Sequence, residues 1–184
     1  TATHICIADS GVERNMSAAR MPSVEFACIC RPVDVCLFCN PTRSALEICV
    51  RELSAGADFT VAFTSGMAAI TSCIHLLKPG DSVAAIADAY GGTLRVLNSV
   101  AGPTYGVTAD YCEFAASSGQ ETREDAVARI AAVLRGLPHR DTTRMVWLES
   151  PSNPLLNIVD ISAVAEAIKQ VFPYSASDDA ADGG

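Results

Sequence analysis

The stretch FTVAFTSGMAAITSCIHLLKPGDSVAAIADAYGG, residues 59–92, contains the pattern that decides the fold class. It opens with FTVAF, a run rich in aromatic and β-branched residues that predicts a short strand. Apolar residues then recur on one face of a predicted helix: Met67, Ile70, Ile74 and Leu77. The turn-forming segment KPGD, residues 78–81, ends this helix, and a second strand is predicted at 82–87.

The same alternation continues in both directions. On the N-terminal side a helix is expected from Asn40-Pro41 to a stop at Gly56, with an apolar face formed by Leu46, Cys49, Val50 and Leu53. On the C-terminal side the expected elements are a helix at 93–100, a strand at 107–112, a helix around 127–134, a strand at 145–148 and a helix at 162–172. Strands that alternate with helices predict an α/β fold with a largely parallel sheet flanked by helices.

The overall composition restricts the functional classes. The 184 residues leave room for one domain, and 49% of them are hydrophobic, so a packed core is expected. A net charge of −8 argues against nucleic acid or an anionic membrane as a partner. The sequence has no apolar run of about 18 residues to span a membrane, and its start lacks the order of a signal peptide. Eight irregularly spaced cysteines favour reduced thiols and a cytoplasmic location.

Three loops follow predicted strands, and in a parallel sheet such loops meet at the carboxyl edge, where ligands bind. The first is Ser65-Gly66-Met67. Glycine lets a ligand approach the backbone closely, and the free amides at a helix start suit a phosphate group. The same residues also suit an ordinary connection between a strand and a helix.

The second loop places Tyr90 before two glycines, so that its ring is free to lie on a planar ligand. Thr93 is expected to cap the next helix, and Arg95 is a candidate for binding a carboxylate or a phosphate. In isolation, a core tyrosine and a surface arginine explain these residues equally well.

The third loop, ESPSNP at residues 149–154, follows the predicted strand MVWL. Its two prolines stiffen the backbone and fix the side chains of Glu149 and Asn153 at the sheet edge. A purely structural proline turn does not explain a carboxylate and an amide placed together.

Four cysteines near the N-terminus allow a different interpretation. Cys28, Cys30, Cys36 and Cys39 form a Cys-x-Cys followed by a Cys-x-x-Cys, which is enough thiolates for a tetrahedral zinc site. The tight first spacing argues against zinc. The same cysteines also fit a redox pair, or buried or incidental thiols, and the sequence leaves all three interpretations open.

Five motifs occur in an order and spacing that resemble one family: NPTRSALE at 40–47, FTSGMAAI at 63–70, LLKPGDSV at 76–83, DAYGGTLR at 88–95 and WLESPSNPLLNIVDI at 147–161. Together they resemble the Cys/Met-metabolism family of pyridoxal-phosphate (PLP) enzymes, the trans-sulfuration enzymes cystathionine γ-lyase, cystathionine γ-synthase, cystathionine β-lyase and methionine γ-lyase. The resemblance covers about 40–172 and implies a partial PLP-binding domain, the N-terminal part of the large domain of type I PLP-dependent transferases. Residues 1–39 are then an irregular N-terminal arm and 173–184 an acidic tail of small residues.

The resemblance also implies a role for each loop. The segment Ser65-Gly66-Met67 would bind the cofactor phosphate. Tyr90 would stack on the pyridine ring, support proton movement and help to position the substrate. Asn153 would contact the hydroxyl side of the ring with Glu149 nearby, and Arg95 would bind the amino-acid substrate. No metal ligand is implied.

The sequence departs from the family pattern at the cofactor. Family members have a tyrosine and an arginine, reaching a neighbouring subunit's cofactor phosphate, where this sequence has Val35 and Leu37. The Schiff-base lysine and the pyridinium-binding aspartate would follow the last predicted helix. The two lysines present, Lys78 and Lys169, lie in other settings.

The implied function is PLP-dependent trans-sulfuration, the cleavage or exchange of carbon–sulfur bonds in substrates such as cystathionine, by a chain truncated before its lysine and inactive alone. Asp178 or Asp179 could replace the aspartate, although no apolar strand would position them. Two competing hypotheses are a non-catalytic truncated paralogue that binds a full-length relative, and zinc binding through the four cysteines. A homo-oligomer, or a complex with a full-length paralogue, is the expected assembly.

Overall fold

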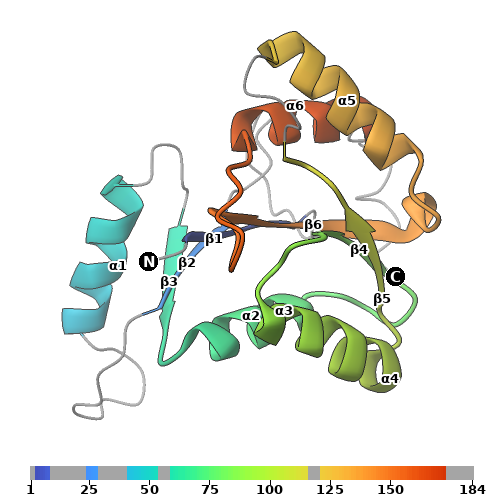
Figure 1. Ribbon diagram of the computed structural model, residues 1–184. Helices are drawn as coiled ribbons and strands as arrows, with labels where there is room; N and C mark the ends of the chain where they lie inside the picture. Colours follow the sequence, from blue (N-terminus) through green and yellow to red (C-terminus); the bar gives the residue numbers. More distant parts are fainter. Residues whose placement is uncertain (1–2, 9–23, 29–40, 54–58, 116–120, 173–184) are drawn as a thin grey trace, which may run out of the picture.

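Within residues 3–8, 24–28, 41–53, 59–115 and 121–172, which the computed structural model describes, six strands form one sheet in the order β3-β2-β1-β6-β4-β5 (Figure 1). The strands are β1 (Thr3–Ala8), β2 (Val24–Cys28), β3 (Phe59–Phe63), β4 (Ser82–Ile86), β5 (Thr108–Cys112) and β6 (Thr143–Ser150). β1 is antiparallel to both β2 and β6, while β2–β3, β4–β5 and β4–β6 are parallel pairs. All described strands except β1 therefore run in one direction, and a largely parallel sheet is confirmed.

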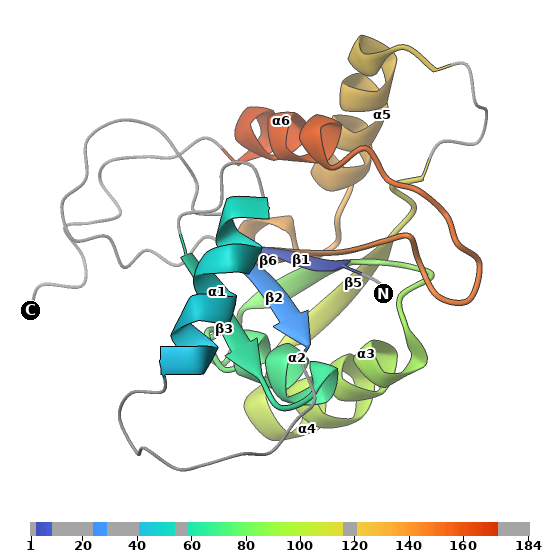
Figure 2. The same cartoon turned by 90° about the vertical axis from the view of Figure 1, so that its left-hand side faces the viewer.

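Helices cover both faces of this sheet (Figure 1). The helices of the described residues are α1 (Pro41–Leu53), α2 (Gly66–Ile74), α3 (Gly91–Val96), α4 (Gly102–Tyr105), α5 (Arg123–Arg135) and α6 (Ile161–Val171), with a π-helical segment at Leu97–Ala101 and a 3-10 turn at Arg140–Thr142. α5 and α6 lie together on one face and α2, α3 and α4 on the other, while α1 lies beside β3 (Figure 2). The α/β class expected from the sequence is confirmed.

Strand β4 shows how the sheet is buried on both faces. All five of its residues are buried. Val83 and Ala85 belong to the core cluster beneath α2 and the π-helical segment, whereas Ala84 and Ile86 belong to the cluster beneath α5 and α6. Successive side chains of a strand point to opposite faces, so this uninterrupted apolar strand packs against helices on both sides.

Side-chain caps fix where three of the helices begin. In each, an oxygen accepts the N–H of the residue three positions later: Ser65 from Ala68 (3.1 Å, α2), Thr122 from Asp125 (3.2 Å, α5) and Asp160 from Ala163 (2.9 Å, α6). Such a cap satisfies one of the donors that the first helical turn leaves without a partner. The start of α2 matters for function, because it is one of the candidate ligand loops.

The N-terminal region differs from the expectation. β1 and β2 lie within residues 1–39, and β1 pairs with β6 along its whole length, from Thr3 opposite Ser150 to Ala8 opposite Met145. The prediction of an irregular arm is therefore wrong at these two segments. Strand pairing between residues so far apart in the chain leaves little trace in local periodicity.

Several candidate positions of the sequence lie outside the described residues: Cys30, Val35, Cys36, Leu37, Cys39, Asp178 and Asp179, while only the backbone of Cys28 is described. Zinc binding, the altered phosphate contact and the replaced aspartate therefore stay predictions. In the described part of the chain, no group of three or more His, Cys, Asp and Glu side chains is arranged to hold a metal ion. None of the helices in these ranges combines the length and apolar character needed to cross a membrane.

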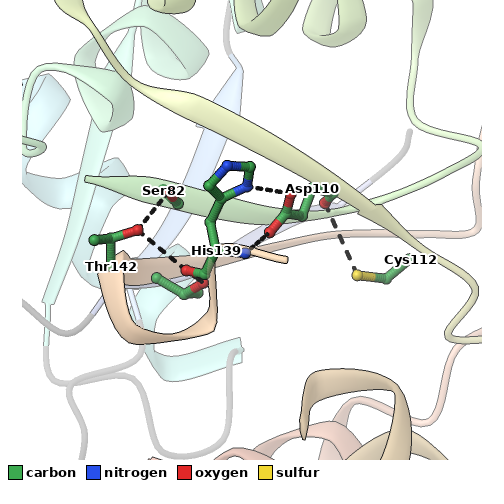
Figure 3. A network of polar contacts seen from close by, with 6 residues as sticks. Ser82, Asp110, Cys112, His139 and Thr142 are labelled. Carbon is green, nitrogen blue, oxygen red and sulfur yellow. Dashed lines mark hydrogen bonds and ion pairs between the residues drawn. The ribbon is translucent and has the colours of Figure 1, made fainter. Parts of the chain in front are cut away.

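A polar network fixes the turn that leads into β6 (Figure 3). Oδ2 of Asp110, on β5, accepts the backbone N–H of His139 at 3.0 Å, and its Oδ1 lies 2.8 Å from Nδ1 of the same histidine. The carbonyl of His139 accepts the hydroxyl of Thr142 at 3.1 Å, and that hydroxyl oxygen lies 2.9 Å from the one of Ser82. The Asp110 side chain is only 8% exposed. Because a buried carboxylate requires hydrogen-bond partners, this network determines where β6 begins.

We expect Asp110→Ala to lower the free energy of unfolding by about 2–3 kcal/mol, because two contacts to a buried carboxylate are lost together. Urea denaturation followed by the fluorescence of Trp147 measures the change. The matched control is Asp141→Ala, since the Asp141 side chain is 92% exposed. Equal effects of the two substitutions would show that the network contributes nothing particular to stability.

The thiol of Cys112 lies close to this network and is buried at the end of β5. Burial, and next the negative charges of Asp110 and Glu113, raise the pKa of the Cys112 thiol to about 12. At pH 8 we expect iodoacetamide to modify the exposed Cys49 at least about tenfold faster than Cys112. Peptide mass spectrometry measures both rates, and the difference should disappear in urea. Similar modification rates of Cys49 and Cys112 in the folded protein would contradict the burial and the raised pKa of the Cys112 thiol.

Candidate functional site

The loops after β3, β4 and β6 lie at one edge of the sheet. These strands run in the same direction, so their carboxyl ends point the same way. The loop after β3 leads into α2, and the loop after β4 leads into α3. The loop after β6 spans residues 151–160 and leads into α6. The three segments that the sequence singled out are thus placed at a common edge.

The start of α2 offers backbone donors. Ser65 caps the helix through Ala68, so the N–H groups of Gly66 and Met67 precede the first hydrogen bonds of the helix. A Cβ built on Gly66 would meet nothing within 4 Å, which means that the space beside this backbone is open. Amides at a helix start attract anions because the helix dipole adds to the individual donors.

Gly92 marks the place where the first two loops meet. A Cβ at this position would lie 2.7 Å from the sulfur of Met67 and 3.0 Å from Cδ1 of Tyr90, and would contact Cε1 of the same ring. A real Cβ does not tolerate such distances, so only glycine lets the Tyr90 ring and the Met67 side chain come together here. The ring remains 43% exposed. A flat aromatic surface therefore lies beside the amide-lined start of α2.

A buried carboxylate ties the second loop to the end of β6. Glu149, at the end of β6, is 1% exposed. Its Oε2 accepts the backbone N–H of Tyr90 at 2.6 Å, and its Oε1 accepts the hydroxyl of Thr93 at 2.7 Å and the indole N–H of Trp147 at 3.1 Å. A carboxylate only accepts hydrogen bonds, so it can satisfy all three donors. Glu149 thereby fixes the start of α3, including Tyr90.

Two other candidate residues are exposed. The side chains of Asn153 and Arg95 have no hydrogen bond or ion pair with another residue of the described ranges. Arg95 lies on α3, one turn after Tyr90, and Asn153 lies in the loop after β6. Both side chains are thus open to a ligand, and their predicted roles stay predictions.

Several residues that shape this edge were not identified as functional from the sequence. Thr93 was expected to cap α3, but it is the third residue of that helix and its hydroxyl donates to Glu149 instead. Trp147 looked like an ordinary core residue of the strand MVWL, although its N–H contacts the same carboxylate. Asp88, Ser152 and Asn157 lie in motifs quoted from the sequence, but their contacts with one another were not predicted. The charge of Asp88 directly after an apolar strand was the available indication.

Neither lysine lies at this edge. Lys78 follows the C-terminal end of α2, whereas the candidate anion site is at the start of the helix. Lys169 lies in the last turn of α6, which covers the opposite face of the sheet from α2 and α3. The described residues of the three loops and of α3 thus provide amides, an aromatic ring, a carboxylate and a guanidinium, but no amine.

Comparison with known proteins adds an independent result. The family model described as "Cys/Met metabolism PLP-dependent enzyme" matches residues 37–178. Cystathionine beta-lyase of Coxiella burnetii is 38% identical over 131 residues, which are 71% of this chain and 30% of that protein. Cystathionine gamma-synthase of Mycobacterium bovis is 41% identical over 128 residues, 69% of this chain and 29% of that protein.

A solved structure gives the same result. Cystathionine gamma-lyase from Lactobacillus plantarum, complexed with L-serine, is 34% identical with a TM-score of 0.56, covering 72% of this chain and 30% of the other. The chain thus spans about 30% of the length of the relatives it matches. These relatives are named for different reactions, so the similarity identifies a family and not a single reaction.

We expect Glu149→Gln to lower the free energy of unfolding by about 2–3 kcal/mol, because an amide cannot accept from all three donors and one remains buried without a partner. The emission of Trp147, the single tryptophan of the sequence, should change as well, since its N–H contacts this side chain. Glu166→Gln is the control, because the Glu166–Arg123 pair is half exposed and contributes little. Similar results for both variants would mean that Glu149 does not fix the site.

Proposed function

The chain belongs to the Cys/Met-metabolism family of PLP-dependent enzymes, and from this membership we propose that the edge formed by α2, Tyr90 and Glu149 binds PLP. The proposed activity is that of a trans-sulfuration enzyme, which cleaves or exchanges carbon–sulfur bonds in amino acids such as cystathionine. The observation that supports it best is the position of Gly92, where the Tyr90 ring and the start of α2 come together.

The residues present fit the phosphate and the ring of this cofactor. The N–H groups of Gly66 and Met67, in the open space beside Gly66, suit the phosphate. The exposed Tyr90 ring suits stacking on a planar pyridine, and Glu149 holds its backbone in place. We propose Asn153 as the contact to the hydroxyl side of the ring.

The protein's contribution to the chemistry is orientation. When bound, PLP supplies an electron sink for bonds at the α-carbon of an amino acid. Tyr90 would hold the plane of the ring and keep water from its covered face. Its hydroxyl would move a proton, and Arg95 would bind the carboxylate of the substrate through paired hydrogen bonds.

The position of the lysines supports a further part of the proposal. Lys78 and Lys169 are the only lysines of the sequence, and both lie away from the site. We propose that these 184 residues bind the cofactor without a covalent bond and catalyse no turnover by themselves. A non-catalytic role, in which the chain binds a longer paralogue in the cytoplasm, is the second candidate.

Titration with PLP tests the proposed site, with Trp147 as the reporter. Trp147 contacts Glu149, which contacts the backbone of Tyr90, so cofactor bound there should quench the indole emission. We expect saturable quenching of the native protein. Gly92→Ala should weaken binding at least about tenfold, because the new Cβ displaces the Tyr90 ring and the Met67 side chain.

Gly91→Ala is the matched control. A Cβ at Gly91 meets nothing within 4 Å, so this variant should bind like the native protein. Borohydride treatment followed by peptide mapping then shows whether a lysine becomes covalently modified. No saturable quenching, or equal binding by the two alanine variants, would refute the proposed site. Specific modification of Lys78 or Lys169 would refute the proposal of non-covalent binding.

A further inference from the structure

We infer that Asp88 is a positioning residue, whose carboxylate holds the loop after β6 against the loop after β4 and so sets the position of Asn153 relative to Tyr90. The assignment of these two residues to a cofactor rests on the proposed function. The contacts of Asp88 do not depend on that assignment.

Asp88 lies two residues before Tyr90 and two residues after the end of β4. Its Oδ2 accepts the hydroxyl of Ser152 and, at 2.7 Å, the side-chain amide of Asn157. The chain separation is 64 residues to Ser152 and 69 residues to Asn157. Asp88, Ser152 and Asn157, here called the Asp88 cluster, thus join two loops that are distant in the sequence.

The Asp88 cluster also organises the third loop internally. The backbone N–H of Ser152 donates to the carbonyl of Asn157 at 2.9 Å, and the N–H of Asn157 donates to the hydroxyl of Ser152 at 3.1 Å. The N–H of Leu156 donates to the carbonyl of Ser152 at 3.0 Å. Ser152 is fully buried, while Asn153, next to it, is exposed. The cluster therefore anchors the loop from inside and leaves Asn153 projecting toward solvent.

Glu149 and Asp88 join the loop after β4 to two different points, the end of β6 and the loop that follows it. Glu149 extends from the end of β6 to the backbone of Tyr90, whereas Asp88 extends from the end of β4 to Ser152 and Asn157. The Glu149 contact fixes Tyr90 against the end of β6 but does not hold the loop that follows that strand. The Asp88 contacts are made inside that loop, so together with Glu149 they set the spacing between Tyr90 and Asn153.

The partners of Asp88 make the role testable by exchange of residues. No lysine, arginine or histidine in the described ranges forms an ion pair with Asp88, so the carboxylate depends on neutral donors. Asp88→Asn removes the charged acceptor, and Asn157→Asp places a second carboxylate against the first. The double variant, with both substitutions, again places an amide opposite a carboxylate, but the amide now lies in the loop after β4 and the carboxylate in the loop after β6.

The first measurement is amide hydrogen exchange of the native protein and its variants, without cofactor. We expect the amides of Ser152, Leu156 and Asn157 to exchange on the order of tenfold faster in each single variant, because their hydrogen bonds depend on an anchored loop. The double variant should return close to native protection. Asp141→Asn, at an exposed aspartate remote from the loop, is the matched control and should change nothing there.

The second measurement is PLP affinity from the quenching of Trp147. Each single variant should bind about tenfold more weakly and the double variant should recover, whereas a loop with only a structural role would leave affinity unchanged. Ser152→Ala, which removes one neutral donor, gives the same comparison if a charged variant fails to fold.

The two measurements separate the possible failures. Native exchange rates in the single variants would overturn the role of Asp88. Faster exchange with unchanged affinity would show that the cluster anchors the loop without positioning Asn153, which also overturns the inference. Failure of the native protein to bind PLP would refute the proposed function. The hydrogen-exchange rates of the single and double variants would still test whether Asp88 anchors the loop.

Discussion

The buried carboxylate of Glu149 is the interaction on which the arrangement of the site depends. A carboxylate removed from water is costly unless its oxygens are satisfied, and here Tyr90, Thr93 and Trp147 donate to it. The three donors come from two different segments, β6 and the start of α3. The hydrogen bonds that stabilise the buried carboxylate therefore also fix the start of α3 and the backbone of Tyr90. The same contacts thus meet the need of Glu149 for donors and set the geometry of the site.

The parallel sheet supplies the setting for this interaction. Because β3, β4 and β6 run in the same direction, their following loops share one edge. At that edge lie the free backbone N–H groups of Gly66 and Met67 at the start of α2, and the aromatic ring of Tyr90. The side chain of Met67 and the ring of Tyr90 come together beside Gly92. The Asp88 cluster adds a second connection between the loops. A cofactor with an anionic group and a planar ring matches these features, in agreement with the family to which the chain belongs.

Much of the fold could be predicted from the sequence, because helix and strand periodicity reflect local burial. Residues 59–92 contain a strand, a helix and a strand, close to the observed bounds of β3, α2 and β4. β1 and β2 were missed, since their pairing with β6 and β3 involves residues far away in the chain. At the site, the three loops were recognised from glycines, prolines and polar residues. Thr93 was predicted to cap α3, but its hydroxyl donates to the distant carboxylate of Glu149. The sequence does not distinguish between these two uses of one hydroxyl.

By itself, the sequence determined the α/β class, the order of the elements from α1 onward and the loops that lie at the carboxyl edge, since all three follow from residue spacing. Only the tertiary structure decided which polar groups are used within the protein and which remain open to a ligand. Glu149 and Asp88 accept hydrogen bonds from segments distant in the sequence, whereas Asn153 and Arg95 stay exposed. That division depends on contacts between residues roughly 60 positions apart in the chain. The local spacing of apolar and polar residues does not show which residues so far apart in the sequence come into contact.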